Sequence, residues 1–336
     1  MSNTKAAGRG KGAKLGALLS GAVLATVAAV ATAGTIQLKV SETLSAGFPS
    51  VDALSEMVSR INAKPDGTLK MTFYPGGQLG NEKETTEQTQ LGAIQMNRIS
   101  VAVLGAIVDD VNVLSLPYLF RDVQHMEKFI DSPVGDELLD AITNKPNSRL
   151  VGLAWLGAGA RSVFTTDKQV ETVSDLEGLK IRIIANPLFS DTLAAMGASP
   201  VPLGWGDVFT GLQTGTLDGA ESAPPTIVSA SLQTITKYFT TTEHLIVPDV
   251  LVMSRRTWDR LSEEQREEIR VAVKQMKQRQ RELWRVAEKK SLDTMREAGM
   301  QISTFQHKDE LKKMTQGVRD KYGAKYQAWI DKIGRL

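Results

Sequence analysis

The stretch Gly178-Leu-Lys-Ile-Arg-Ile-Ile-Ala-Asn-Pro187 combines two local patterns. Apolar residues in its first half alternate with Lys180 and Arg182, which predicts a half-buried strand. Asn186 then supplies a helix N-cap, and Pro187 occupies the first helical position, where proline is favoured. Because a strand that leads into a helix is the repeating unit of α/β proteins, this stretch predicts an α/β fold.

Arg182 is the first candidate functional residue. An arginine on a half-buried strand is difficult to bury without a partner. A guanidinium at the end of a strand, facing the start of a helix, can grip a carboxylate with two parallel hydrogen bonds. The position therefore indicates capture of a small acid, and a buried structural ion pair is the alternative.

Strands and helices alternate along the rest of the chain. Alternating or β-branched runs predict strands over 35–40, 69–74, 94–103, 149–155, 180–184, 216–221 and 247–254. Apolar residues at helical spacing predict helices over 51–61, 82–91, 127–142 with a break at Pro133, 187–196 and 205–214. A strand–helix–strand order predicts a parallel or mixed sheet.

Chain length and one long helix indicate two domains. About 300 residues are too many for one ordinary core, and the absence of cysteine means that hydrophobic burial must stabilise the fold without disulfides. Ser262 and Gln265 form a capping box, and no proline interrupts the sequence from there to about Ala298. A helix of this length suggests a strut laid across both domains.

The chain begins with a basic segment that contains no acid, and an apolar run over 15–31 follows. That run closes on Ala31-Thr32-Ala33, a small-x-small cleavage signal. The pattern predicts an export signal peptide over 1–33, cleaved after Ala33, and hence a periplasmic protein. A retained anchor helix is the alternative.

The charge balance argues against nucleic acid as a partner. The chain has 40 basic and 38 acidic residues, and removal of the four basic residues of the leader leaves a net charge of −2. Nucleic-acid binders concentrate a basic surplus on one face, which this composition does not supply. No second apolar run is long enough to span a bilayer, so we do not expect the mature protein to be membrane-embedded.

Motifs of catalysis and cofactor binding are missing. The patterns Gly-x-Ser-x-Gly, Gly-x-x-x-x-Gly-Lys-Ser/Thr and His-Glu-x-x-His do not occur. Zinc sites of the cysteine kind are excluded, and His125, His244 and His307 lie far apart in the sequence. The loop over 157–162 begins like a dinucleotide-binding loop but lacks the third glycine. We therefore expect no enzyme activity, no metal site and no cofactor.

Four further residues are candidates for ligand contact. Arg161 leaves the glycine-rich loop and is either a second donor to the ligand or a surface residue. Glu221 and Ser222 lie at the end of a predicted strand, where open α/β sheets commonly meet ligands, and a simple turn is the alternative. Trp205 offers a flat wall for a sugar ring, although tryptophan more commonly packs in a core.

Five stretches form a specific combination when taken in chain order. They are Tyr74-Pro-Gly-Gly-Gln-Leu-Gly80 with Glu82, Leu116-Pro-Tyr-Leu-Phe120, Asp175-Leu-Glu-Gly-Leu-Lys-Ile-Arg182, Met196-Gly-Ala-Ser-Pro200 and Leu212-Gln-Thr-Gly-Thr-Leu-Asp-Gly219. Together they resemble the substrate-binding subunits of tripartite ATP-independent periplasmic (TRAP) transporters, over essentially the whole chain after the leader. The resemblance implies two α/β domains of periplasmic binding protein type, joined by crossing strands and a long helix, with the ligand in the interdomain cleft.

The resemblance also implies domain boundaries and site residues. Domain I is expected over 34–158 plus 248–286, and domain II over 159–247 plus 287–336. Arg182 matches the family's arginine that binds the ligand carboxylate, and Arg161 matches a second cleft arginine. The remaining expected cleft residues are Glu82 near its floor, Ser222 where many members carry asparagine, the neighbouring Glu221, Glu42 or Thr43 after the first strand, and Trp205. A serine at 222 is shorter than asparagine and lacks the two amide donors.

The segment over 238–265 looks like the branch of the family that binds uronates and related sugar acids. The implied function is capture of a small organic acid in the periplasm and its delivery to the membrane subunits of a TRAP transporter, without catalysis. One alternative is a periplasmic sugar-acid lyase or isomerase with Glu82 or His244 as its base. The other is a binding protein that serves a sensor kinase.

Overall fold

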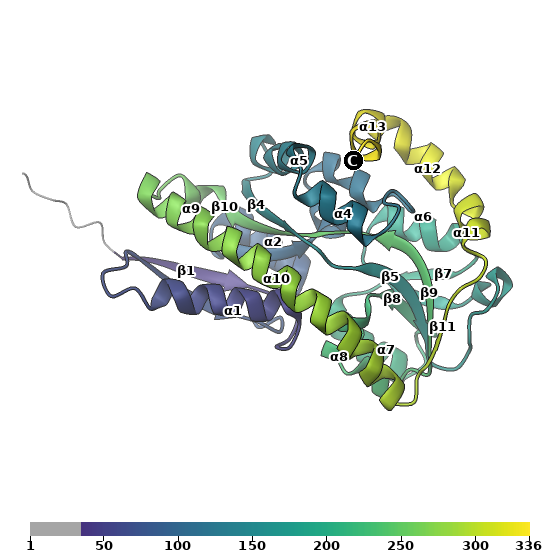
Figure 1. Cartoon of the computed structure of the whole chain (residues 1–336). Helices are drawn as coiled ribbons and strands as arrows, with labels where there is room; N and C mark the ends of the chain where they lie inside the picture. Colours follow the sequence, from purple (N-terminus) through teal and green to yellow (C-terminus); the bar gives the residue numbers. More distant parts are fainter. Residues whose placement is uncertain (1–34) are drawn as a thin grey trace, which may run out of the picture. The chain divides into compact units, whose positions relative to one another are not determined.

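The computed structural model describes residues 35–336, which fold around two mixed β-sheets (Figure 1). The α/β class predicted from the sequence is confirmed. The predicted signal peptide, its cleavage after Ala33 and the alternative anchor helix lie outside the described residues. Among residues 35–336, no helix combines the length and the apolar character needed to cross a bilayer.

The first sheet has five strands, and we call it and the helices on it lobe I. Its order is β2 (Leu69–Tyr74), β1 (Ile36–Ser41), β3 (Met96–Ser100), β10 (Asp249–Ser254) and β4 (Leu150–Leu156). β1 is parallel to β2 and β3, whereas β10 is antiparallel to β3 and β4. The late strand β10 therefore lies between two strands formed much earlier in the chain.

The second sheet has six strands, and it forms lobe II with its own helices. Its order is β11 (Gln301–Ser303), β9 (Tyr238–Ile246), β5 (Ala160–Thr165), β8 (Gly219–Ser222), β6 (Lys180–Ile183) and β7 (Ser199–Pro202). β6 is parallel to β7 and β8, and β5 is antiparallel to β8 and β9. The chain passes from lobe I to lobe II between β4 and β5, and returns between β9 and β10.

Helices connect the strands and cover the sheets. They are α1 (Pro49–Asn62), α2 (Glu82–Leu91), α3 (Val101–Leu104), α4 (Val123–Ile130), α5 (Pro133–Asn144), α6 (Pro187–Ala195), α7 (Val208–Gln213), α8 (Pro224–Ser229), α9 (Arg255–Trp258), α10 (Glu263–Glu297), α11 (Lys308–Met314), α12 (Gln316–Gly323) and α13 (Gln327–Gly334). The Asn186 cap is confirmed, because its side chain accepts a hydrogen bond from the Leu188 amide, and Pro187 begins α6.

The long helix α10 is the predicted strut. Ser262 and Gln265 form the expected capping box at its start, and it continues for 35 residues. It packs on α1 and β4 in lobe I and on α8 and β11 in lobe II, and Figure 1 shows it running past α1 towards α8. One continuous helix therefore contacts both lobes.

Two predicted elements differ from the observed ones. The strand expected over 94–103 ends at Ser100, and the next four residues form α3. The strand β9 was not predicted. Its register against β5 shifts between Arg161 and Val163, and Glu243 has a φ of +46°, so the alternation that marks a strand is interrupted.

The lobes share part of their hydrophobic core. One cluster of buried side chains contains Ile99 and Trp155 from lobe I together with Ile183 and Phe189 from lobe II. Residues 35–336 accordingly form one compact unit. The domain boundaries expected at 158, 247 and 286 stay a prediction.

Candidate functional site

A cavity of about 460 Å³ is lined by residues of both lobes. Thr43, Glu82 and Val103 contribute from lobe I, and Arg182 and Trp205 from lobe II. A second hollow of about 60 Å³ shares Thr43, Glu82, Arg182, Ile184 and Trp205 with the first and is also lined by Arg98, Arg161, Ser222 and Asp249. We call the two connected hollows the cleft.

Arg182 lies on β6 and is only 4 % exposed. Its Nε donates a hydrogen bond of 2.8 Å to the Leu203 carbonyl, and its guanidinium carbon lies 5.3 Å from the centre of the Trp205 ring. These contacts orient the side chain without neutralising it, and no carboxylate of residues 35–336 forms an ion pair with it. Burial lowers the pKa of Arg182 to about 10, opposed by the charge of Glu221 and assisted by that of Arg161.

An arginine in this state lacks a partner that its chemistry requires. A buried guanidinium is normally paired, because desolvation of an isolated charge is costly. Its two terminal nitrogens receive no acceptor from the described residues, and the side chain lines both parts of the cleft. A carboxylate that enters the cleft can supply the two parallel hydrogen bonds that are absent.

Arg161, by contrast, is already paired. Its Nε and Nη2 donate hydrogen bonds of 2.5 and 2.8 Å to the carboxylate of Glu221, and Nη2 also donates to the Glu221 carbonyl at 2.9 Å. Burial favours the neutral acid, but the charge of Arg161 outweighs it and lowers the pKa of Glu221 to about 2. The pair adds no net charge to the cleft, and it fixes the side of Arg161 that lines the smaller hollow.

This pair predicts a pH-dependent contribution to stability. The contribution of Glu221 is present above its ordinary pKa of 4.5 and is lost as the pH falls towards 2. Glu221→Gln should lower the free energy of unfolding at pH 7 by on the order of 3 kcal/mol. Urea denaturation at several pH values should show this difference shrinking below pH 4.5. A difference that stays constant between pH 7 and pH 3 would contradict the assignment.

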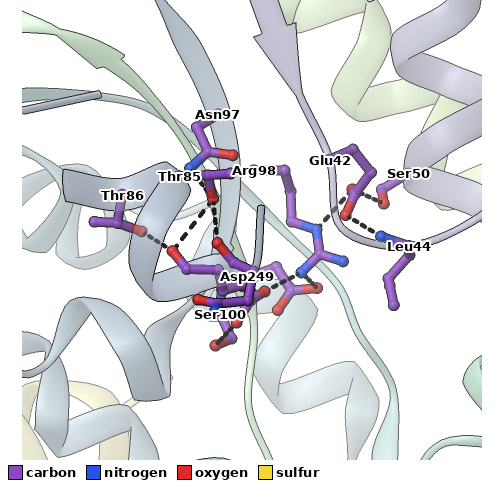
Figure 2. Close-up of polar contacts among 11 residues, drawn as sticks. Glu42, Leu44, Ser50, Thr85, Thr86, Asn97, Arg98, Ser100 and Asp249 are labelled. Atoms are coloured by element: carbon purple, nitrogen blue, oxygen red, sulfur yellow. Dashed lines mark hydrogen bonds and ion pairs between the residues drawn. The ribbon is translucent and has the colours of Figure 1, made fainter. Parts of the chain in front are cut away.

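The lobe I side of the cleft is built around Arg98 of β3, which is 2 % exposed. Arg98 donates hydrogen bonds to Glu42 at 2.8 Å through Nε and to Glu82 at 3.0 Å through Nη1, and its Nη1 lies 3.5 Å from Asp249 (Figure 2). We call Glu42, Glu82 and Asp249 the acidic wall. Three carboxylates thus surround one guanidinium.

Hydrogen bonds from neighbouring groups hold two members of the acidic wall. Glu42 accepts from the Leu44 amide at 3.0 Å and the Ser50 hydroxyl at 2.9 Å. Glu82, at the start of α2, accepts from the amide and hydroxyl of Ser100 at 3.2 and 2.7 Å. Both carboxylates are therefore oriented before any ligand enters.

Asp249, at the start of β10, has the most perturbed carboxylate of the acidic wall. Burial raises its pKa to about 7, the charge of Arg98 opposes this rise, and Glu82 and Glu42 add to it. Its side chain is 13 % exposed and lines the smaller hollow. An ionised Asp249 is thus costly in the empty protein.

The structure brings most of the predicted site residues to one place. Thr43, Glu82, Arg182 and Trp205 line the larger hollow, and Arg161 and Ser222 line the smaller one. Glu42 and Glu221 are fully buried, and their side chains bind Arg98 and Arg161 instead of lining the cleft. Ligand contact by each of these residues stays a prediction.

Sequence reasoning missed Arg98, Asp249 and Lys83, all of which line the cleft. Arg98 carried the same signal as Arg182, namely an arginine inside a predicted strand. Asp249 follows Pro248 at the start of a predicted strand, which is an end of a strand where polar residues reach a site. Lys83 is exposed on α2, and no local pattern distinguishes it from other surface lysines.

The family model for bacterial extracellular solute-binding proteins, family 7, matches residues 40–327. The chain belongs to this family. The resemblance to TRAP solute-binding subunits, inferred from five short stretches, is confirmed. The arrangement of two lobes around a cleft with an unpaired arginine is therefore a solute-binding site built on this family's fold.

Solved structures of similar proteins carry sugar acids. A TRAP periplasmic solute binding protein from Pseudomonas putida F1 with bound D-glucuronate is 39% identical, with a TM-score of 0.86 over 90% of this chain and 97% of that one. A protein from Bradyrhizobium in complex with α/β-D-galacturonate is 35% identical, with a TM-score of 0.85 over 90% of this chain and 100% of that one.

A third relative, from Citrobacter koseri, has been solved in two states. With bound D-glucuronate it is 38% identical and has a TM-score of 0.87 over 90% of this chain and 100% of that one. The apo, open structure has a TM-score of 0.78, at 36% identity over 89% and 98% of the two chains. The solute-binding protein described above therefore resembles the ligand-bound form more closely than the open form.

Proposed function

We propose that this solute-binding protein captures a uronate or a related hydroxy carboxylate and delivers it to a TRAP transporter. The observation that carries the proposal is Arg182, a buried guanidinium without an acid partner in a cleft lined by both lobes. The ligand carboxylate docks on this guanidinium, and Trp205 provides an apolar surface beside it. The bound uronates of the similar structures support this ligand class.

Closure of the cleft is part of the proposed mechanism. Hinge motion between two lobes excludes water, and the lower local dielectric strengthens the charge-assisted hydrogen bonds to the carboxylate. The better superposition on a ligand-bound relative than on an open one supports a cleft that has both states. The strands that cross between the lobes are the natural hinge, because few segments connect the two sheets there.

We further propose that the protein acts in the periplasm after cleavage behind Ala33 and that the closed form is recognised by the membrane subunits. The chain itself performs no reaction in this proposal. His244, one of the two bases considered for a lyase or isomerase, is fully buried with its Nδ1 on the Thr242 hydroxyl at 2.8 Å. Glu82, the other, already accepts hydrogen bonds from Arg98 and Ser100.

A thermal-shift screen tests the proposal. The panel contains D-glucuronate, D-galacturonate, D-gluconate, succinate and, as a neutral control, D-glucose. A ligand at about 100 times its dissociation constant stabilises by roughly 2.7 kcal/mol, which corresponds to a rise in melting temperature of roughly 5 °C. The uronates should produce this rise, and glucose should not. The absence of a shift with every acid would contradict the proposal, and turnover of an acid, followed by NMR, would replace capture with catalysis.

A further inference from the structure

The two sides of the cleft differ in charge. On the lobe II side, Arg161 and Glu221 neutralise each other, so Arg182 contributes one uncompensated positive charge. On the lobe I side, Arg98 is the single cation paired with the three carboxylates of the acidic wall. A ligand in the cleft therefore lies between a positive end and a negative end.

Asp249 is the member of the acidic wall that has acceptor capacity to spare. No described residue donates a hydrogen bond to its carboxylate, and its nearest cationic atom, Nη1 of Arg98, lies 3.5 Å away and already binds Glu82 at 3.0 Å. The other two carboxylates are held by serine side chains and backbone amides. The free lone pairs of Asp249 are therefore available to the smaller hollow that it lines.

A second observation indicates that a polar ligand group belongs beside Asp249. Nη2 of Arg98 is buried and has no hydrogen-bond partner among residues 35–336, although the side chain lines the same hollow. An unmade hydrogen bond at a buried guanidinium is costly. A hydroxyl group satisfies both neighbours at once, because it can accept from Arg98 and donate to Asp249.

We propose that Asp249 is a specificity-determining residue that accepts a ligand hydroxyl and rejects a second carboxylate. The inference rests on the proposed function, since it takes Arg182 as the binding point of the first carboxylate. Arg182 and Asp249 line the same hollow, so they contact opposite parts of one small ligand. The protein then binds polyhydroxy monocarboxylates and excludes aldaric acids, which carry a carboxylate at each end.

The exclusion follows from hydrogen-bond chemistry and charge. An ionised carboxylate has no proton to donate to Asp249, and like charges placed side by side in a desolvated site are strongly unfavourable. Lys83 is the other cation that lines the cleft, but it is exposed on α2, where solvent screens its charge. It therefore does not compensate a second ligand carboxylate beside the acidic wall.

Isothermal titration of the full mature chain with D-glucuronate and D-glucarate tests this inference. These probes have the same carbon skeleton and differ in whether C1 is a hydroxyl-bearing centre or a carboxylate. At pH 8 Asp249 is ionised, because burial raises its pKa only to about 7. The wild-type protein should bind D-glucuronate at least about 100-fold more tightly than D-glucarate.

Asp249→Asn keeps the shape of the side chain and removes its charge. This variant should bind D-glucuronate more weakly and D-glucarate more tightly, so that the ratio of the two affinities falls by at least about tenfold. Asp309→Asn is the matched control, because it removes one negative charge from a side chain that is 91% exposed and outside the cleft. It should leave the ratio unchanged.

The outcomes separate this inference from the proposed function. Equal affinity of the wild-type protein for both acids overturns the role of Asp249 while the capture of acids stands. An unchanged ratio in Asp249→Asn, with a cooperative thermal transition that shows a folded protein, also overturns it. Binding of neither these acids nor any other of the panel contradicts the proposed function itself.

Discussion

Arg182→Met is expected to lower the affinity for an acid ligand by about 3 to 4 kcal/mol, a factor of several hundred. The methionine preserves much of the aliphatic side chain but removes the two terminal donors that face the cleft. Since no described residue offers Arg182 a carboxylate, the ligand is the only partner that loses a charge-assisted pair. Titration of D-glucuronate into the wild-type and variant proteins measures the loss directly.

Two controls distinguish binding from folding in this experiment. Arg182→Lys retains the positive charge but not the planar fork, so its affinity should lie between those of the wild type and Arg182→Met. Without ligand, Arg182→Met should be at least as stable as the wild type, because removal of an unpaired buried charge removes a desolvation cost. An undiminished affinity in the folded methionine variant would contradict the proposed binding mode.

Arg98→Met is expected to produce the largest loss of stability. Removal of this guanidinium leaves Glu42, Glu82 and Asp249 facing one another in a buried site without their cation. Loss of one partner of a buried ion pair typically lowers the free energy of unfolding by about 3–5 kcal/mol. Urea denaturation at pH 8 should show a loss of this size.

The pH dependence of that variant supplies its own control. The pKa of Asp249 is raised from 3.8 to about 7, so its carboxyl is protonated in the folded protein below pH 7 and one of the three repelling charges disappears. The destabilisation of Arg98→Met should therefore be smaller at pH 5 than at pH 8. The double variant Arg98→Met/Asp249→Asn should recover part of the loss at pH 8. Equal stability of Arg98→Met and wild type at both pH values would contradict the role assigned to Arg98.

Local sequence patterns predicted the elements that depend on neighbouring residues. β2 and α2 were predicted at their observed bounds, and the Asn186 cap and the capping box of α10 follow from spacings of a few residues. Arg182 was identifiable because a charged residue on a half-buried strand is unusual. The strand β9 escaped prediction because its bulge interrupts the alternation on which such predictions depend.

The pairing of charges across the cleft was not predictable in the same way. Arg98 and Glu42 are 56 residues apart, and Arg161 and Glu221 are 60 residues apart, so no local spacing signals either contact. Glu42 and Glu221 were expected as candidate ligand contacts, whereas their side chains orient two arginines from behind the cleft surface. Sequence identified the polar residues of the site, and only the tertiary structure shows which of them lack a partner.

The place of β10 in its sheet has a consequence for biosynthesis. This strand lies between β3 and β4, yet it is the last of the five strands to be translated. A nascent chain that has not reached Ser254 cannot complete the hydrogen-bond ladder that joins these two strands. The first lobe therefore completes its sheet only after about three quarters of the polypeptide has been made, which favours folding after release from the ribosome over stepwise folding during synthesis.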